Sequence, residues 1–223
     1  MTLVNLLDGS SAAIVFGGTA LATLLRCGFV DLRHTAHSLL HFGRNPFDAG
    51  AVRAELAVQV QAINRDGLLR AQPQHFTDRE FEDATDALFG TRSVAALLER
   101  HESHKARRQI ACNRAVRTLA QAAELAPVFG LAGTLVSLSQ LPADGIAKGA
   151  FAAAISMAVL TTLYGLLLAN LLLAPLARMI ERAGAAEEAE RQNVVDWLAS
   201  QVEAAMPRPS LSVVPSEHGR EAI

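Results

Sequence analysis

Uncharged apolar stretches alternate along this chain with charged segments that have helical spacing. The longest uncharged run extends from Gly149 to Ala174, and another covers Leu125 to Leu141. A helix of about 20 apolar residues is long enough to cross the hydrocarbon core of a bilayer. Because only a short polar break separates the two runs, the pattern predicts a transmembrane hairpin of two helices.

A third apolar stretch runs from Gly9 to Leu25 and is near the short end of the length needed to cross a bilayer. The alternative is a cleaved signal peptide, which requires a positively charged start. No Lys or Arg precedes Arg26. We therefore interpret this stretch as a retained first transmembrane helix.

Basic residues flank the three stretches unevenly. Those expected on one side of the membrane are Arg26, Arg33, Arg107, Arg108, Arg114, Arg117, Arg178 and Arg182. Between the second and third stretches the only basic residue is Lys148. The positive-inside rule then places residues 31–117 and the C-terminus in the cytoplasm, with the N-terminus and the hairpin turn outside.

The residues between the first and second stretches also have helical patterns. Apolar residues recur at helical spacing from Ala49 to Ile63, and Arg65-Asp66-Gly67 is expected to end that helix. Thr77 followed by Glu80 is a capping-box pattern, which predicts a helix running to about Phe89.

From Thr91 onward no Pro or Gly interrupts the sequence until the membrane, which predicts one long helix rising into the second span. The third span is expected to continue through Met179–Ala205, with Gly184 as a weak point. The Pro- and Ser-rich tail after Met206 is expected to be disordered.

The predicted fold is therefore an all-α integral membrane bundle with three transmembrane helices, two of them extended into long cytoplasmic helices. Its expected divisions are a first transmembrane helix (1–30), a cytoplasmic helical segment (31–117), a transmembrane hairpin (118–178), a cytoplasmic C-terminal helix (179–205) and a tail (206–223).

Composition narrows the function classes. The formal net charge of the 223 residues is -2, and no basic patch interleaved with aromatic residues suggests nucleic-acid binding. Cys27 and Cys112 form no metal-ligand pattern and are interpreted as ordinary small apolar residues. No nucleophile elbow, phosphate-binding loop or catalytic carboxylate pair is present, so we expect neither an enzyme nor a cofactor.

Histidines provide the one pattern that favours a metal-dependent enzyme. His34, His37 and His41 have spacings of three and four, and His101 and His104 form a second pair. That spacing suits metal ligands, but no acidic residue accompanies the first group. Histidines at the membrane interface are the alternative, and we predict no metal site.

Hydroxyl-bearing residues lie inside the hairpin. Gly130, Thr134 and Ser137 share one helical face of the second span, where small residues also permit simple helix packing. Thr161 and Thr162 lie in the middle of the third span. A membrane threonine commonly bonds to a carbonyl of its own helix, yet hydroxyls at the middle of two successive spans suggest a lined path.

Two prolines and an acidic residue border the same hairpin. Pro127 is expected near the start of the second span and Pro175 at the end of the third, where they permit bending. Glu124 lies about a turn before Pro127, but no titratable residue occupies the central part of any span. Hydroxyls do not hold and release protons near neutral pH, so a proton path requires a partner with an acidic residue in its own transmembrane helix.

These residues resemble those of the MotA/TolQ/ExbB proton-channel family. The hairpin contains APVFGLAGT and, in the following helix, TLYGLLLANLLLAPLA; the first span contains IVFGGTALATLL, which resembles the MotA branch. The segment INRDGLLRAQ is similar to a cytoplasmic element of that branch. The resemblance implies a homopentamer around a single-span MotB/ExbD/TolR-like partner that carries an intramembrane Asp, in the bacterial inner membrane.

The resemblance also implies residue roles. Thr134 and Thr162 match pore-lining threonines, with Thr161 and Ser137 also expected along the proton path. Pro127, Pro175 and Glu124 match positions that border the channel, and Arg65 matches an arginine that contacts the rotor. Departures from the MotA pattern are a missing first span, which gives the span count of ExbB and TolQ, and Gln72 in place of a Glu of the rotor-contacting element.

Three functional hypotheses remain open from the sequence. The first is a proton-channel subunit of an ion-driven motor, either a flagellar-type stator or an ExbB/TolQ-type energy transducer. The second is a non-conducting membrane scaffold, and the third is the metal-dependent enzyme. The sequence leaves the ion open, although a lining of hydroxyls without acidic ligands favours protons over sodium.

Overall fold

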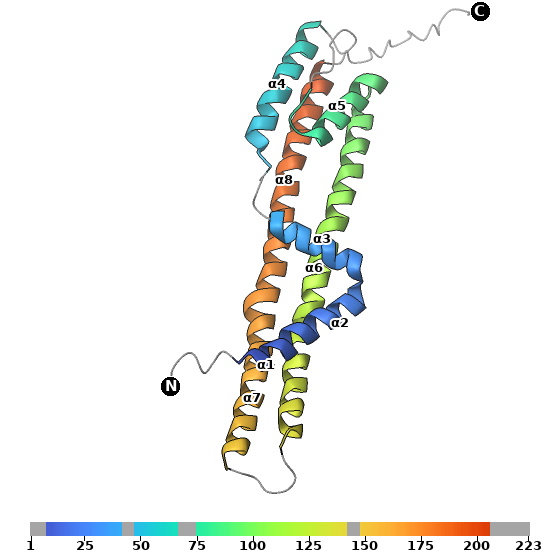
Figure 1. Ribbon diagram of the computed structural model, residues 1–223. Coiled ribbons are helices and arrows are strands. Elements are labelled where there is room, and N and C mark those ends of the chain that lie inside the picture. The colour runs from blue at the N-terminus through green and yellow to red at the C-terminus, as the bar shows by residue number, and fades with distance from the viewer. Residues whose placement is uncertain (1–7, 42–46, 67–74, 142–147, 206–223) are drawn as a thin grey trace, which may run out of the picture. The chain divides into compact units, whose positions relative to one another are not determined.

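The computed structural model describes residues 8–41, 47–66, 75–141 and 148–205. Every regular element within these ranges is a helix, which confirms the all-α prediction (Figure 1). The elements are α1 (Gly9–Ala12), the π-helical turn η2 (Ala13–Gly17), α2 (Gly18–Cys27), α3 (Phe29–His41), α4 (Ala49–Asp66), α5 (Arg79–Thr91), α6 (Val94–Ser139), α7 (Lys148–Leu167), the π-helical turn η3 (Leu168–Leu173) and α8 (Ala174–Ala205).

Three of these described segments are long and apolar enough to cross a membrane, as predicted. They are Gly9–Cys27, the helix Val94–Ser139, and the continuous run Phe151–Ala205 through α7, η3 and α8. The two long helices extend well beyond their apolar stretches, which confirms that the second and third spans continue as charged helices. Their exact membrane boundaries stay a prediction.

The chain forms two compact units, and both α6 and α8 run through each of them. The first unit falls within residues 1–48 and 103–191, and the second within residues 49–102 and 192–223. The first therefore holds the candidate hairpin with α1–α3, and the second holds α4 and α5 with the charged ends of α6 and α8.

A small buried cluster in the first unit holds the N-terminal helices against the hairpin. Val15 of η2 is buried together with Ala126 of α6 and with Leu168 and Ala169 of η3, and Tyr164 packs at the edge. Lipid tails are as apolar as these side chains, so their burial provides little driving force within a membrane. Close shape complementarity and hydrogen bonds must supply more of the stability of this part.

A second cluster lies along the charged parts of the same helices. Ala115 and Leu119 of α6 are buried against Ala177 and Ile180 of α8, and Leu39 of α3 packs on them. Gly28 between α2 and α3 has a φ of 87°, a left-handed conformation that favours glycine. This turn redirects the chain so that α3 can pack on the cluster.

The second unit has a core of large apolar side chains. Its fully buried members are Leu56 and Ile63 of α4, Phe81 and Leu88 of α5, Leu97 of α6, and Val195, Leu198 and Val202 of α8. In water, burying one such side chain contributes about 1.5–3 kcal/mol. This unit has the packing expected of a water-soluble helical bundle.

The predicted capping box at Thr77 is wrong by one residue. Asp78 is the N-cap of α5, and its carboxylate accepts hydrogen bonds from the backbone N–H groups of Glu80 and Phe81. Thr77 instead donates its hydroxyl to Glu55 over 2.6 Å. The interaction with α4 therefore decides which of two adjacent capping residues begins the helix.

Other predicted boundaries shift slightly. α4 includes Arg65 and Asp66, α5 continues past Gly90 to Thr91, and α6 begins at Val94. Arg92, with a φ of 57°, ends α5. α8 passes through Gly184 without interruption. The predicted disordered tail lies outside the described residues.

Candidate functional site

The backbones of α6 and α7 approach each other closely where glycines face one another. A Cβ on Gly165 would lie 2.7 Å from the carbonyl oxygen of Ala126, and one on Gly130 would lie 3.0 Å from the carbonyl oxygen of Thr161. A Cβ on Gly133 would lie 2.8 Å from the Thr161 Cβ. Because these neighbours are backbone or a stiff β-branched side chain, the crossing depends on all three glycines.

Two of the predicted site residues are buried at this crossing. The Thr161 side chain is fully buried and donates to the Ala158 carbonyl over 2.9 Å, while Ser137 donates to the Gly133 carbonyl over 2.8 Å. Each hydroxyl is therefore satisfied by its own helix. Within one chain these two residues contribute to the helix contact rather than to an open surface.

Thr134 and Thr162 have a different environment. Both are partly exposed, and they donate to the carbonyls of Leu131 and Ala158 over 2.6 Å and 3.2 Å. Each hydroxyl oxygen can still accept a hydrogen bond. Among the four predicted path hydroxyls, these two can thus interact with something outside this chain.

Pro127 lies inside α6 rather than at its start, because the helix begins far earlier in the chain than the membrane span. A proline lacks the N–H that would bond the carbonyl four residues before it, here that of Ala123. Its neighbour Ala126 belongs to the buried cluster with Val15 and with Leu168 and Ala169 of η3. The interrupted hydrogen bonding at Pro127 and the two π-helical turns, η2 and η3, therefore lie next to one another around this cluster.

Pro175 is the second residue of α8 and follows η3 directly. At the end of this turn the N–H of Ala174 donates to the carbonyl of Ala169, five residues back. Such wide turns are rare within helices and often occur at functional sites. The sequence placed Pro175 at the end of the third span but gave no sign of the π-helical turn beside it.

Glu124 and Arg65 are both exposed on the surface of the chain. Glu124 forms an ion pair with Arg26 of α2, in which a carboxylate oxygen lies 3.8 Å from a guanidinium nitrogen. Both side chains are more than half exposed, so this pair contributes at most about 1 kcal/mol. Arg65 lies in the last turn of α4, in the second unit.

Asp8 is a polar residue near the hairpin that the sequence analysis did not single out. It caps α1 by accepting from the Ser11 backbone N–H over 2.9 Å, and both the Ser10 and Ser11 hydroxyls donate to its carboxylate. Its own N–H donates to the hydroxyl of Tyr164 on α7 over 3.2 Å. An Asp directly before an apolar run, with serines two and three positions later, is a helix-start signal that could have identified it.

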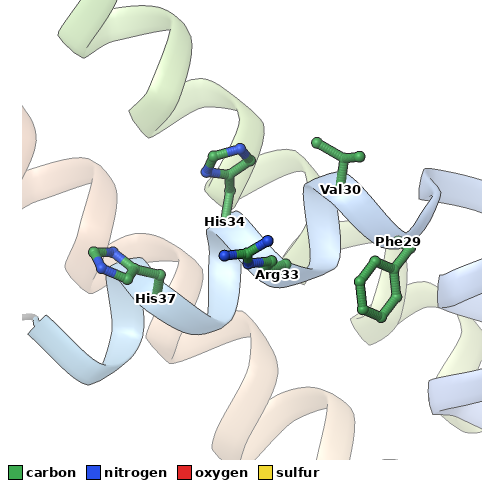
Figure 2. Close-up of a pocket in the computed structure, with 5 residues that line it drawn as sticks. All are labelled: Phe29, Val30, Arg33, His34 and His37. Atoms are coloured by element: carbon green, nitrogen blue, oxygen red, sulfur yellow. The ribbon is translucent and has the colours of Figure 1, made fainter.

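The histidine pattern does not form a metal centre in the described part of the chain. His34 and His37 lie on α3 beside Arg33, and they line a shallow hollow of about 400 Å³ with Phe29 and Val30 (Figure 2). The described residues contain no group of three or more His, Cys, Asp or Glu side chains suited to hold an ion. The side chain of His41 lies outside the described ones.

His101 of the second histidine pair lies in the second unit, where it has a structural setting. His101 is buried, and its ring centroid lies 6.4 Å from that of Phe81. A buried imidazole packed on a core aromatic ring is typical of a structural histidine.

Comparison with known proteins decides the family. The family model for MotA/TolQ/ExbB proton channels matches residues 73–193, which is more than half of the chain and includes the whole hairpin. The chain belongs to the MotA/TolQ/ExbB proton channel family. This confirms the resemblance given by the hairpin motifs, and a family of proton channels agrees with the expectation that the chain is not an enzyme.

Individual proteins are similar to this chain over a longer part of its sequence than the family model covers. Motility protein A of Cereibacter sphaeroides is 28% identical over 196 residues, covering 86% of this chain and 76% of that protein. The structure of C. jejuni MotAB matches with a TM-score of 0.81 at 19% identity, covering 92% of this chain and 82% of that one. The flagellar MotAB stator complex from Bacillus subtilis matches with a TM-score of 0.80 at 18% identity, covering 91% and 81%. At such identities the two structures show a shared fold.

Proposed function

We propose that this member of the MotA/TolQ/ExbB family is the channel-forming subunit of a flagellar stator-type motor in the bacterial inner membrane. The observation that carries the proposal is the family match across the glycine-lined hairpin. The similarity of nearly the whole chain to a Motility protein A, together with the fold shared with two MotAB structures, favours the stator over an ExbB/TolQ-type transducer.

The proposal requires a partner that supplies the titrating group. Neither uncharged run of the hairpin contains an Asp, Glu or His. A threonine hydroxyl does not ionise near neutral pH, whereas a carboxylate in a protein can gain and lose a proton there. A single-span MotB-like protein with an intramembrane Asp, surrounded by a homopentamer of this chain, meets that requirement.

We assign the contact with this carboxylate to Thr134 and Thr162, which are partly exposed, unlike the buried Thr161 and Ser137. Protonation of the partner's Asp beside them removes a buried charge, so that the ring of subunits can step around the partner. Thr161 and Ser137 have a supporting role at the helix crossing, where they hold α6 and α7 at the spacing that the glycines permit.

The remaining predicted residues have supporting roles in this proposal. Pro127 and Pro175 flank the segment that bends during each step, because each removes a backbone hydrogen bond from a long helix. Glu124 lies at the cytoplasmic end of the path, and Arg65, exposed on the cytoplasmic side, contacts the rotor.

The proposed orientation follows the arginine distribution, with the N-terminus in the periplasm and the C-terminus in the cytoplasm. It makes residues 1–30 and 118–178 the membrane-embedded parts. Residues 31–117 and 179–205 are then cytoplasmic, which places the water-soluble type of core in the second unit on the side where a rotor would lie.

The first test is purification of the tagged chain from its native membrane in mild detergent, with mass spectrometry of the proteins that accompany it. A single-span protein with an intramembrane Asp and a peptidoglycan-binding region supports the stator proposal. A single-span protein with a small periplasmic domain would instead indicate a transducer. If the chain purifies alone, no partner protein supplies the carboxylate and the scaffold hypothesis is favoured.

The second test measures proton uptake into liposomes that contain this chain with the accompanying protein. Thr162→Val should reduce uptake roughly tenfold with the complex still assembled, since a hydrogen bond to a charged group contributes about 1.5–3 kcal/mol. Thr162→Ser keeps the hydroxyl and should retain most of the uptake. A scaffold would show no uptake in either variant and no difference between them.

A further inference from the structure

A polar hollow lies where the first span ends. It has a volume of about 500 Å³ and is bounded by the end of α2, the start of α3 and one side of α6. The residues that line it are Arg26, Cys27, Asp31, Ile110, Asn113, Arg114, Arg117, Thr118 and Gln121. All of them belong to the first unit.

Positive charge exceeds negative charge in this hollow. Its lining contains three arginines and one acidic residue, Asp31. Asp31 pairs with Arg114 over 3.3 Å, and Arg26 pairs with Glu124 outside the lining over 3.8 Å. Neither of these pairs involves Arg117, which among the described residues adds a third positive charge on the exposed side of α6.

Neutral donors accompany the arginines. The Gln121 side-chain oxygen accepts from the Cys27 thiol over 2.9 Å, which leaves the amide NH₂ group of Gln121 directed elsewhere. The exposed side chain of Asn113 provides a second amide group in the lining, in addition to that of Gln121. A guanidinium with neighbouring amide donors suits an oxyanion with several acceptor oxygens, such as a phosphate ester.

The hollow lies at the level where phospholipid headgroups are expected. Gln121 precedes the uncharged run at Leu125 by four residues, about 6 Å along a helix. Headgroup layers add roughly 5–7 Å to each side of the hydrocarbon core. The hollow therefore begins within the headgroup layer at Gln121 and continues toward the cytoplasm, where Arg117 lies about 6 Å further along the helix.

Exposed apolar side chains adjoin the hollow. Leu25 is 79% exposed and directly precedes Arg26, and Phe29 and Val30 are 69% and 61% exposed at the start of α3. Phe29 and Val30 line the neighbouring hollow on α3 together with Arg33 (Figure 2). A basic recess beside exposed apolar residues is complementary to a phospholipid, whose acidic headgroup and acyl chains are joined in one molecule.

We propose that this hollow binds the headgroup of an acidic phospholipid of the inner leaflet, with Arg117 as its principal ligand. The bound lipid would fix the end of the first span and α3 to α6 by joining them through one phosphate. This site is separate from the proton path and goes beyond the proposed motor function, since binding can be measured without proton flow or a partner.

The test uses the purified full chain in neutral detergent and native mass spectrometry. Dioleoyl phosphatidylglycerol is titrated against dioleoyl phosphatidylcholine, and the fraction of lipid-bound protein is compared. The phosphatidylglycerol should bind more tightly, and Arg117→Gln should weaken it about fivefold, because a basic residue near a membrane surface contributes about 1 kcal/mol to acidic-lipid binding. Arg117→Lys should keep most of the affinity.

Arg107→Gln is the matched control, since Arg107 is an exposed arginine of the same helix outside the hollow. It should change the affinity less than twofold. Equal losses for the two Gln variants, or equal binding of the two lipids, would overturn the site. Displacement of the lipid by millimolar inorganic phosphate would show a free-phosphate site instead. A change in oligomer mass without a change in lipid binding in Arg117→Gln would assign the hollow to a second copy of this chain.

Discussion

The hairpin and the second unit are stabilised by opposite kinds of residue. At the hairpin crossing, Gly130 and Gly165 let backbones approach each other, and the small side chains of Ser137 and Thr161 are buried there. In the second unit the buried residues are large, with Phe81 and Leu56 among the largest that are fully enclosed. Water drives the burial of large apolar side chains, whereas lipid rewards only close contact. The same chain thus changes its packing chemistry along α6 and α8, between the apolar hairpin and the charged ends of these helices.

The largest effect should come from removing a large side chain from the second unit. Leu88→Ala should lower the free energy of unfolding by about 2–5 kcal/mol, because it removes buried contacts and leaves a cavity. Leu98 of α6 is 37% exposed, and Leu98→Ala should cost less than about 1 kcal/mol. Trp197 is the only tryptophan and lies in this unit, so its fluorescence during urea unfolding of the full chain reports both variants. Similar decreases in the free energy of unfolding for the two variants would show that the hydrophobic effect does not dominate the stability of this core.

The hairpin should respond to the opposite change, the addition of a methyl group. Gly165→Ala places a Cβ against the carbonyl oxygen of Ala126 and should destabilise the crossing by about 1–3 kcal/mol. Gly149 of the same helix has open space around it, so Gly149→Ala should stabilise slightly through helix propensity, by up to about 1 kcal/mol. Hydrogen exchange of α6 and α7 in detergent measures both changes. Slower exchange in Gly165→Ala would contradict the close crossing.

A partly buried ion pair between α6 and α8 tests whether polar contacts stabilise the charged part of the first unit. The Arg108 guanidinium donates to both carboxylate oxygens of Glu188 over 3.0 Å, and the two side chains are only 20% and 14% exposed. A double-mutant cycle with Arg108→Gln and Glu188→Gln should give a coupling of about 1.5 kcal/mol or more. The same cycle on the exposed Arg26–Glu124 pair should give less than about 1 kcal/mol.

Thermal unfolding of the detergent-solubilised chain, followed by circular dichroism, provides the four stabilities for each cycle. A coupling for Arg108 and Glu188 no larger than that of the exposed pair would mean that their shared hydrogen bonds add nothing to their proximity.

The sequence was sufficient for features that depend on a local pattern. The uncharged runs located the candidate spans, because the bilayer core requires an unbroken apolar length. The uninterrupted segment after Thr91 likewise predicted the long α6. The positions of the hairpin threonines followed from the sequence, but the difference in exposure between Thr161 and Thr162 did not, since it depends on which side of α7 meets Gly133.

Features that depend on contacts between residues far apart in the sequence could not be predicted from it. The capping residue of α5 is Asp78 rather than Thr77 because Glu55, on another helix, takes the threonine hydroxyl. The two π-helical turns have no distinctive composition and form where η2 and η3 pack with Ala126. The contact of Asp8 with Tyr164 joins residues 156 positions apart. Such contacts depend on tertiary packing, which overrides local preference.

The smallest effect concerns pH and applies only to the second unit. His75 lies 2.5 Å from Glu82, and this hydrogen bond raises the pKa of the imidazole above its usual value. A raised pKa means that folding favours the protonated form, so the stabilisation is fully present below the unfolded pKa of about 6.5. It is lost as pH rises through the folded pKa. The Trp197 thermal midpoint should therefore fall more between pH 5.5 and pH 8.5 in the wild type than in Glu82→Gln. An equal fall in both would show that this exposed pair does not contribute, whereas a fall confined to the wild type would place a pH-dependent interaction at the start of α5, outside the apolar hairpin.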